Sequence, residues 1–347
     1  MNDSADPQAN NIDEEFDTTV RPERFDEFVG QEQVRKNLGV YIDAARRRGE
    51  PLEHVLLSGP PGLGKTTLAY IIAREMNSAV RPTSGPALVR PGDLAGLLTG
   101  LNEGDVLFID EIHRLSPVIE EYLYGAMEDF RISIVIDQGV NARSIELSVQ
   151  NFTLIGATTR EGLLTGPFRD RFGIVENLSF YPSEELLQIL KRSASILDIP
   201  VEEEAAKAIA TRARGTPRIV NRYLRRIRDV AQVQGDGIIT MDAVGEGMEM
   251  LGVDEIGLRE MDRRILSSII RHGGGGPVGL KTIAVSVGEE EDTIEEVYEP
   301  FLIQQGFTSK TPRGRVVTSQ AYEHLGLEPP TDAQLKLFSG DSKRTAT

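Results

Sequence analysis

Residues 59 to 67 read Gly-Pro-Pro-Gly-Leu-Gly-Lys-Thr-Thr, and no other part of the sequence is as informative. Its spacing from Gly59 to Gly64-Lys65-Thr66 is that of a loop whose backbone amides surround phosphates while the lysine reaches the terminal ones. An apolar run at 54–58 precedes it and a helical pattern follows over 67–76. A Gly- and Pro-rich surface turn would not need these flanks. The stretch therefore predicts a protein that binds ATP or GTP and hydrolyses it.

A second motif, Val-Leu-Phe-Ile-Asp-Glu at 106–111, ends an apolar strand in two carboxylates. Transfer of a phosphoryl group is catalysed mainly by neutralising and positioning charge. We expect Lys65 to pair with the β- and γ-phosphates, and Thr66 and Asp110 to hold Mg²⁺. Glu111 is placed to polarise the attacking water. A helix cap is the other reading of Asp-Glu after a strand, and the phosphate loop disfavours it.

A third apolar run, 152–156, leads into Thr158 and Thr159. A hydroxyl at this strand end could contact the γ-phosphate or the attacking water. Threonines at strand ends also serve simply to cap turns. We place Thr158 first and Thr159 second for the catalytic role, and the sequence leaves the choice between them open.

The composition bounds the class of protein. A chain of 347 residues can form two or three domains with real cores. It has no cysteine, which excludes disulfides, thiol catalysis and Cys-ligated zinc. No apolar run approaches the roughly 18 residues of a membrane span, and the first residues do not resemble a secretion signal. A cytoplasmic location is the expectation.

The formal net charge of −16 is distributed by region. Residues 1–17 carry six acidic and no basic side chains, and 289–299 carry seven acidic and none basic. Residues 212–228 contain seven arginines and no acids, and Lys310, Arg313 and Arg315 lie close together. Phosphate binding needs local positive charge, so the overall acidity argues against a chain that coats nucleic acid and leaves room for a local DNA site.

The chain divides into regions of different pattern. Short apolar strands alternate with helical patterns over 18–181, which predicts an α/β domain with a parallel sheet. Residues 182–252 read as a small helical domain without strands, in which Thr216 can cap a helix that begins at Pro217. Over 253–330, a helix at 258–271, two more helical segments and a hairpin around 311–314 resemble a winged helix. We expect a disordered lead at 1–17 and a flexible tail at 331–347.

Two β-type runs, 131–136 and 144–149, flank the turn-like segment 137–141 and predict a hairpin. Apolar residues occur on both arms. Packing against the core and docking of another protein explain them equally well.

Together these motifs resemble the AAA+ ATPases in order and spacing, with the box 166–173 and Gly215-Thr216-Pro217-Arg218 as further matches. Closer still is the resemblance to the RuvB family of bacterial Holliday junction branch-migration motors, through 21–31, Asp110-Glu111-Ile112-His113-Arg114 and 306–315. It covers about residues 18–330. Relatives usually have Ser and Leu at Gly166 and Phe168, and often Arg at Lys310, but none of these departures removes a group assigned to chemistry.

The resemblance implies a homohexameric ring that binds ATP and Mg²⁺, with Arg171 entering the neighbour's nucleotide site as an arginine finger. Such a finger is worth roughly 10³ to 10⁵ in hydrolysis rate. Arg218 would act from the helical lid on the subunit's own nucleotide. The resemblance also implies adenine and ribose contacts near Val20, Arg21 and Tyr181, and contacts across the interface from Glu128, Asp129 and Phe130. In the phosphate loop, Gly62, Gly64 and Thr67 are further expected contacts of the nucleotide.

The winged helix gives a separate prediction about DNA. The acidic segment 289–299 would be repelled by phosphates, so it should not enter the groove. The wing carries Lys310, Arg313 and Arg315 and no side chains suited to reading base edges, which predicts sequence-independent binding to duplex and junction DNA. Three phosphate contacts would give a slope of log affinity against log salt of about −2.7 per subunit.

Family resemblance also implies protein partners. The hairpin corresponds to the surface that docks RuvA, with Ile145 and Leu147 as contact candidates, and the RuvC resolvase is a further partner. Two other functions share these motifs: a clamp-loader-like ATPase, and an ATP-switched DNA-binding regulator. Processive movement of DNA strands separates the motor from both. Asp-Glu-Ile-His also occurs in DExH helicases, but the lid and finger motifs fit AAA+ better.

Overall fold

The computed structural model describes residues 18–135, 144–274 and 276–329. Two compact units make up the chain, Met1–Val244 and Gly245–Thr347, and each is described by itself. The predicted lead, the tail and the hairpin turn at 137–141 lie outside the described residues. Within the described part, no helix is long and apolar enough to cross a membrane.

The first unit contains a five-stranded parallel sheet in the order β2-β3-β6-β1-β7. The three central strands, β3 (Val106–Asp110), β6 (Thr153–Thr158) and β1 (Val55–Ser58), are buried almost throughout. That is why they read as continuous apolar runs in the sequence. The edge strands are β2 (Val80–Ser84) and β7 (Ile174–Asn177). The α/β fold is confirmed, although neither edge strand was predicted from the sequence.

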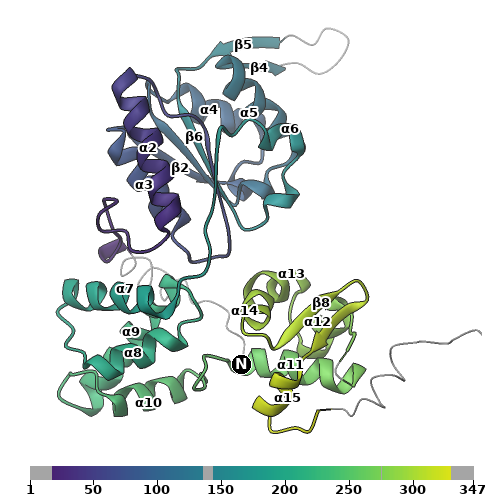
Figure 1. The fold of residues 1–347 in the computed structure, drawn as a ribbon. Helices are drawn as coiled ribbons and strands as arrows, with labels where there is room; N and C mark the ends of the chain where they lie inside the picture. Colours follow the sequence, from purple (N-terminus) through teal and green to yellow (C-terminus); the bar gives the residue numbers. More distant parts are fainter. Residues whose placement is uncertain (1–17, 136–143, 275, 330–347) are drawn as a thin grey trace, which may run out of the picture. The chain divides into compact units, whose positions relative to one another are not determined.

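Helices cover both faces of this sheet (Figure 1). On one side lie α2 (Glu32–Arg48) and α3 (Lys65–Glu75), and on the other α4 (Pro91–Thr99), α5 (Pro117–Asp129) and α6 (Gly166–Arg169). One hydrophobic core joins the second set to β3 and β6. Short 3₁₀ turns complete the layer: η1 (Gly85–Ala87), η2 (Ile112–Arg114) and η3 (Glu161–Leu163). Because the sheet is parallel, β1, β3 and β6 all deliver their carboxyl ends to one edge, where loops bind ligands.

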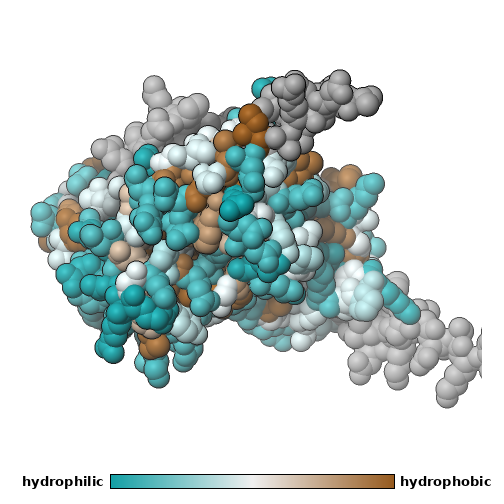
Figure 2. All heavy atoms as spheres, turned by 90° about the horizontal axis from the view of Figure 1, so that it is seen from above, coloured by the Kyte–Doolittle hydropathy of each residue, from teal (hydrophilic) through white to brown (hydrophobic). Residues whose placement is uncertain are grey.

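The predicted hairpin is present as β4 (Arg131–Val135) and β5 (Ser144–Ser148), paired antiparallel. Ile132 is buried and Leu147 packs partly buried against the core, so part of its apolar character is structural. Ile145 is 47% exposed. Hydrophobic side chains also gather on the surface beside the outer end of the hairpin (Figure 2).

Four helices follow: α7 (Ser183–Ile196), α8 (Glu203–Arg212), α9 (Pro217–Gln234) and α10 (Met241–Met250). As predicted, α9 begins at Pro217 and buries one face, which includes Val220 and Tyr223. The capping prediction for Thr216 was half wrong. Thr216 occupies the N-cap position, but its hydroxyl donates to the Arg214 carbonyl and caps no helix amide.

The second unit is a winged helix with its own core. Its elements are α11 (Glu260–Gly273), α12 (Leu280–Val287), α13 (Glu291–Thr293), a π-helical turn η4 (Ile294–Tyr298), α14 (Glu299–Gln304), β8 (Thr308–Thr311), β9 (Gly314–Val317) and α15 (Ser319–His324). The predicted wing is the β8–β9 hairpin. Val278 adds a bridge to Arg315.

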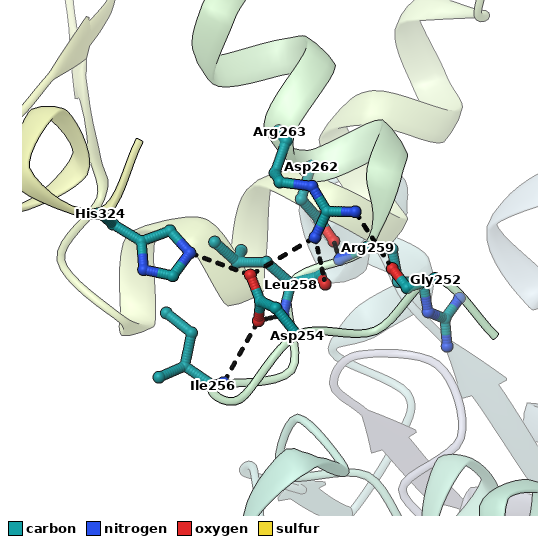
Figure 3. A network of polar contacts seen from close by, with 8 residues as sticks. All are labelled: Gly252, Asp254, Ile256, Leu258, Arg259, Asp262, Arg263 and His324. Carbon is teal, nitrogen blue, oxygen red and sulfur yellow. Dashed lines mark hydrogen bonds and ion pairs between the residues drawn. The ribbon is translucent and has the colours of Figure 1, made fainter. Parts of the chain in front are cut away.

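A polar network around Asp254 connects the segment that leads into α11 with the last helix, α15 (Figure 3). The Asp254 carboxylate accepts hydrogen bonds from the Leu258 amide at 2.8 Å and from His324 Nε2 at 2.9 Å. Arg263 lies 3.4 Å from the same carboxylate and donates to the carbonyl of Gly252. The network ties the incoming chain, α11 and α15 together.

Candidate nucleotide site and the residues around it

The phosphate loop joins β1 to α3 in a conformation that needs glycine. Gly62 and Gly64 have φ angles of 78° and 102°, in the left-handed region that residues with a Cβ rarely adopt. Lys65 is the first residue of α3 and is 8% exposed. Its ammonium donates to the carbonyls of Gly59 at 2.6 Å and Pro60 at 2.8 Å. The lysine is thus held inside the loop, with Thr66 and Thr67 beside it in the first turn of the helix.

Asp110 ends β3, and Glu111 is the N-cap residue of the turn η2 that follows. Asp110 Oδ1 accepts a hydrogen bond from the Glu111 amide at 2.9 Å. Glu111 has a φ of 48° and a ψ of 44°, a strained backbone for a residue other than glycine. Its carboxylate faces Arg114, with 2.9 Å between Nη1 and Oε2. Strain of this kind concentrates at functional sites.

Thr158 lies at the end of β6 in register with Ser58 of β1, directly beside the strand that feeds the phosphate loop. Its side chain is deeply buried, and the residue is 1% exposed. The hydroxyl accepts from the Arg160 amide at 2.9 Å and lies 3.0 Å from His113 Nδ1. Thr158 therefore ties the end of β6 to the turn that carries Glu111. Thr159, the next residue, is half-buried and lies just beyond the strand.

The lid meets the phosphate loop at the start of α9. The Arg218 amide donates to the Gly62 carbonyl at 3.4 Å. A Cβ on Gly62 would meet Thr216 Cγ2 at 2.7 Å and Arg218 Cβ at 3.2 Å. Arg218 was predicted from a motif more than 150 residues after the phosphate loop, and the structure places it in contact with that loop.

Tyr181 lies at the junction of the sheet domain and the lid. Its hydroxyl donates to the Leu63 carbonyl at 3.2 Å, and burial raises the pKa of the phenol. The ring also packs close to Gly30, where a Cβ would meet Tyr181 Cε1 at 2.6 Å.

The N-terminal segment reaches the same region. Val20 is buried, and its carbonyl accepts from Arg192 of α7 at 2.6 Å. Arg21 lies over the ring of Tyr70 in α3, 5.5 Å from its centre. Arg192 was missed in the sequence analysis, because nothing in the sequence links α7 to Val20.

Arg171 lies among residues of α5. Its guanidinium contacts Tyr124 and forms an ion pair with Glu128, with 3.0 Å between Nη2 and Oε2. Asp129 is exposed next to Glu128. Phe130 packs edge-to-face on Phe152 with 6.1 Å between ring centres, so part of its role is structural. Tyr124 was also missed in the sequence analysis, because its pairing with Arg171 spans 47 positions.

The wing's basic residues differ from one another in their surroundings. Arg315 has a side chain that is 11% exposed, and it grips Glu299 through contacts of 2.5 Å and 3.1 Å. These contacts raise the pKa of Arg315. Lys310 lies 2.5 Å from Glu295. Arg313 is exposed at the tip of the hairpin, and it has no ion pair within the described residues.

This geometry fits a nucleotide with its metal. Gly62 and Gly64 leave a loop that any Cβ would disturb, at the N-terminus of α3, where amides and the helix dipole attract phosphate. Magnesium is usually bound by one or two side-chain oxygens together with the phosphates, and Thr66 and Asp110 provide such oxygens. No group of three or more His, Cys, Asp or Glu side chains that could hold a metal ion occurs in the described part of the chain.

Family models of known proteins match three consecutive parts of the chain: the sheet domain, the lid and the winged helix. Residues 20–178 match the model of the Holliday junction DNA helicase RuvB P-loop domain, and 181–254 match the RuvB AAA lid domain. Residues 255–326 match the RuvB C-terminal winged helix domain. The chain belongs to the RuvB family. Among solved structures, the RuvB Holliday junction branch migration motor of Thermotoga maritima is 53% identical, with a TM-score of 0.82. The match covers 90% of this chain and 100% of that one.

A lysine-to-arginine mutant of the Thermotoga RuvB is also 53% identical, with a TM-score of 0.84, and the match covers 90% of this chain and 99% of that one. RuvB is an ATP-driven branch-migration motor, so this member of the family is an ATP hydrolase with a P-loop. The predicted AAA+ domain, helical lid and winged helix are confirmed.

Proposed function

We propose that this chain is a motor that hydrolyses ATP to pull duplex DNA and so drive branch migration of Holliday junctions, acting as a ring of six subunits loaded by a RuvA-type partner. The observation that supports it most directly is the contact of the lid with the phosphate loop, between the Arg218 amide and the Gly62 carbonyl. Through this contact, a change in the phosphates bound at the loop moves the lid. A motor needs such coupling, because it must convert hydrolysis into movement of one domain against another.

Within one subunit, Lys65 would neutralise the β- and γ-phosphates, and Thr66 and Asp110 would hold Mg²⁺. Bound Mg²⁺ supplies charge neutralisation at those phosphates. Glu111 would orient and polarise the attacking water after its carboxylate leaves Arg114. Arg171 would reach the site of the neighbouring subunit, where it stabilises the charge of the transferred phosphoryl group.

We assign the sensing hydroxyl to Thr159, which lies half-buried just beyond the strand, rather than to Thr158, which is deeply buried. The Thr158 hydroxyl is engaged by His113 and by the Arg160 amide inside the core. Thr159→Val should therefore lower kcat with nucleotide binding intact, while Thr158→Val should mainly lower the melting temperature. The opposite pattern in ATPase and thermal unfolding assays would return the role to Thr158.

For DNA, we propose that Arg313 at the tip of the wing grips the phosphate backbone without reading sequence. Lys310 joins it if a phosphate displaces Glu295, and Arg315 acts as a structural support for the wing. For the partner, we propose that Ile145 contacts RuvA, because it is exposed on the hairpin while Leu147 is partly used by the core. Ile145→Ser should abolish RuvA binding at unchanged melting temperature, and retained binding would refute this contact.

The deciding experiment is dissociation of a fluorescently labelled four-way junction by the protein with RuvA and ATP, beside Arg171→Ala. The motor predicts dissociation by the unmodified protein and none by the variant. Absence of dissociation together with DNA-stimulated hydrolysis would identify a loader of protein rings. Slow hydrolysis without DNA stimulation, together with strong sequence preference, would identify a DNA-binding regulator.

A further inference from the structure

Two side chains of α5 hold the guanidinium of Arg171. Its Nη2 donates to the Tyr124 hydroxyl and lies 3.0 Å from Glu128 Oε2. The guanidinium carbon also lies over the Tyr124 ring, 4.4 Å from its centre, which is a cation–π contact. Tyr124 and Glu128 are four positions apart and therefore share one face of the helix. The hydrogen bond to Tyr124 also raises the pKa of Arg171.

The backbone of Arg171 is anchored as well. Phe168 and Phe172 are buried on either side of it in sequence and pack edge-to-face, with 5.4 Å between ring centres. The base of the side chain is therefore fixed, and the remaining freedom lies in its own rotatable bonds. An arginine side chain has many rotamers, so it loses conformational entropy when it binds a phosphate. Each contact that selects one rotamer beforehand reduces that loss.

The contacts leave one edge of the guanidinium for a ligand. Nη2 is engaged by Tyr124 and Glu128, and Nε is buried without a hydrogen-bond partner. Nη1 donates no hydrogen bond within the described residues, where the one side-chain hydrogen bond of Arg171 runs from Nη2. A phosphate oxygen would therefore meet Arg171 at Nη1, with the opposite nitrogen held in place.

We propose that Tyr124 is a positioning residue for the arginine finger: its ring and hydroxyl orient Arg171 so that Nη1 is presented to the γ-phosphate bound by the neighbouring subunit. This inference rests on the proposed function, in which Arg171 acts in the next subunit's site. Tyr124 does not itself touch the nucleotide. Its removal should lower the rate of hydrolysis and leave nucleotide affinity unchanged.

The first test compares Tyr124→Phe, which keeps the ring and loses the hydroxyl, with Tyr124→Leu, which loses both. We expect kcat to fall on the order of 10-fold in the first and 100-fold in the second, because a small misplacement of a catalytic group can cost that much. The affinity for a fluorescent ATP analogue should not change. Tyr122→Phe is the matched control, since Tyr122 lies two positions away on another face of the same helix. Its kcat should equal that of the unmodified protein.

The second test asks on which side of the interface Tyr124 acts. Lys65→Ala subunits cannot hydrolyse ATP, but they carry an intact finger with its tyrosine. Mixed with them, Tyr124→Leu subunits should regain hydrolysis wherever a Lys65→Ala neighbour supplies the finger. The mixture of Arg171→Ala with Lys65→Ala is the reference, and the double variant Tyr124→Leu/Arg171→Ala should be no slower than Arg171→Ala alone.

The two mixtures separate failure of this inference from failure of the proposed function. If the reference mixture stays inactive, Arg171 does not act across subunits and the proposed function fails. If the reference regains activity and the Tyr124→Leu mixture does not, the finger stands and the role of Tyr124 is overturned. Unchanged kcat in both tyrosine variants also overturns it. Tyr124→Phe, which preserves the ring's packing, decides the question if thermal unfolding shows that Tyr124→Leu is misfolded.

Discussion

Gly62 shows how closely the phosphate loop and the lid approach each other. It has a φ of 78°, and a Cβ there would lie 2.7 Å from Thr216 Cγ2. Gly104 has almost the same φ, 80°, but a Cβ there would meet nothing within 4 Å. The two glycines therefore separate the cost of the backbone conformation from the cost of a contact with the lid.

We expect Gly62→Ala and Gly104→Ala each to lower the free energy of unfolding by about 1–2 kcal/mol, because alanine is strained at positive φ. Only Gly62→Ala should also weaken ATP binding, since its methyl group pushes the lid off the loop. Thermal unfolding and titration with a fluorescent ATP analogue measure the two effects. Equal ATP affinity in both variants would show that the lid contact does not matter for binding.

At this scale the sequence predicted residues whose chemistry is local. Lys65, Asp110 and Glu111 stand in short motifs, and the structure places Lys65 in the loop and both acids at the end of β3. Contacts between distant positions were not predictable. The acids of 289–299 and the bases of the wing are separate clusters in the sequence, whereas Glu299 and Arg315 form one ion pair 16 positions apart.

Among the elements, the three central strands of the sheet were predicted and the two edge strands were not. A strand covered on both faces must be apolar at every position, which gives an unmistakable run. β2 is a half-exposed edge strand that contains Pro82, a residue that argues against a strand in any sequence pattern. β7 alternates buried and exposed positions over only four residues. Neither the pattern of β2 nor that of β7 can be recognised as a strand in the sequence unless the edges of the sheet are already known.

The wing yields a prediction that contrasts two arginines of one hairpin. Arg313→Ala should reduce the slope of log DNA affinity against log salt by about 0.9, the loss of one phosphate contact, and leave the melting temperature unchanged. Arg315→Ala should cost on the order of 3 kcal/mol of stability, because Glu299, whose side chain is 8% exposed, loses its nearest counter-charge and keeps only Lys310 at 4.0 Å. Salt titrations of duplex binding and thermal unfolding distinguish the two. An unchanged slope for Arg313→Ala would remove it from the DNA site.

For the whole molecule, the two compact units have separate hydrophobic cores. The large core of the sheet domain draws its residues from positions 56–172, and the core of the winged helix draws its own from 258–322. Neither core needs the other's side chains. ATP chemistry and DNA binding should therefore separate when the chain is cut between them.

We expect a fragment of residues 1–252, which keeps α10 intact, to bind ATP with the affinity of the full chain. Its hydrolysis should not respond to DNA, because the wing is the proposed DNA contact and lies in the missing unit. The measurement is ATPase activity with and without duplex DNA for the fragment and the full chain, with full-length Lys65→Ala as the inactive control. Stimulation of the fragment by DNA to the level of the full chain would place the decisive DNA contact in the first unit. Stimulation restricted to the full chain, and reduced there by Arg313→Ala, would show that the wing delivers the DNA signal to the ATP site, which is the coupling a translocating motor requires.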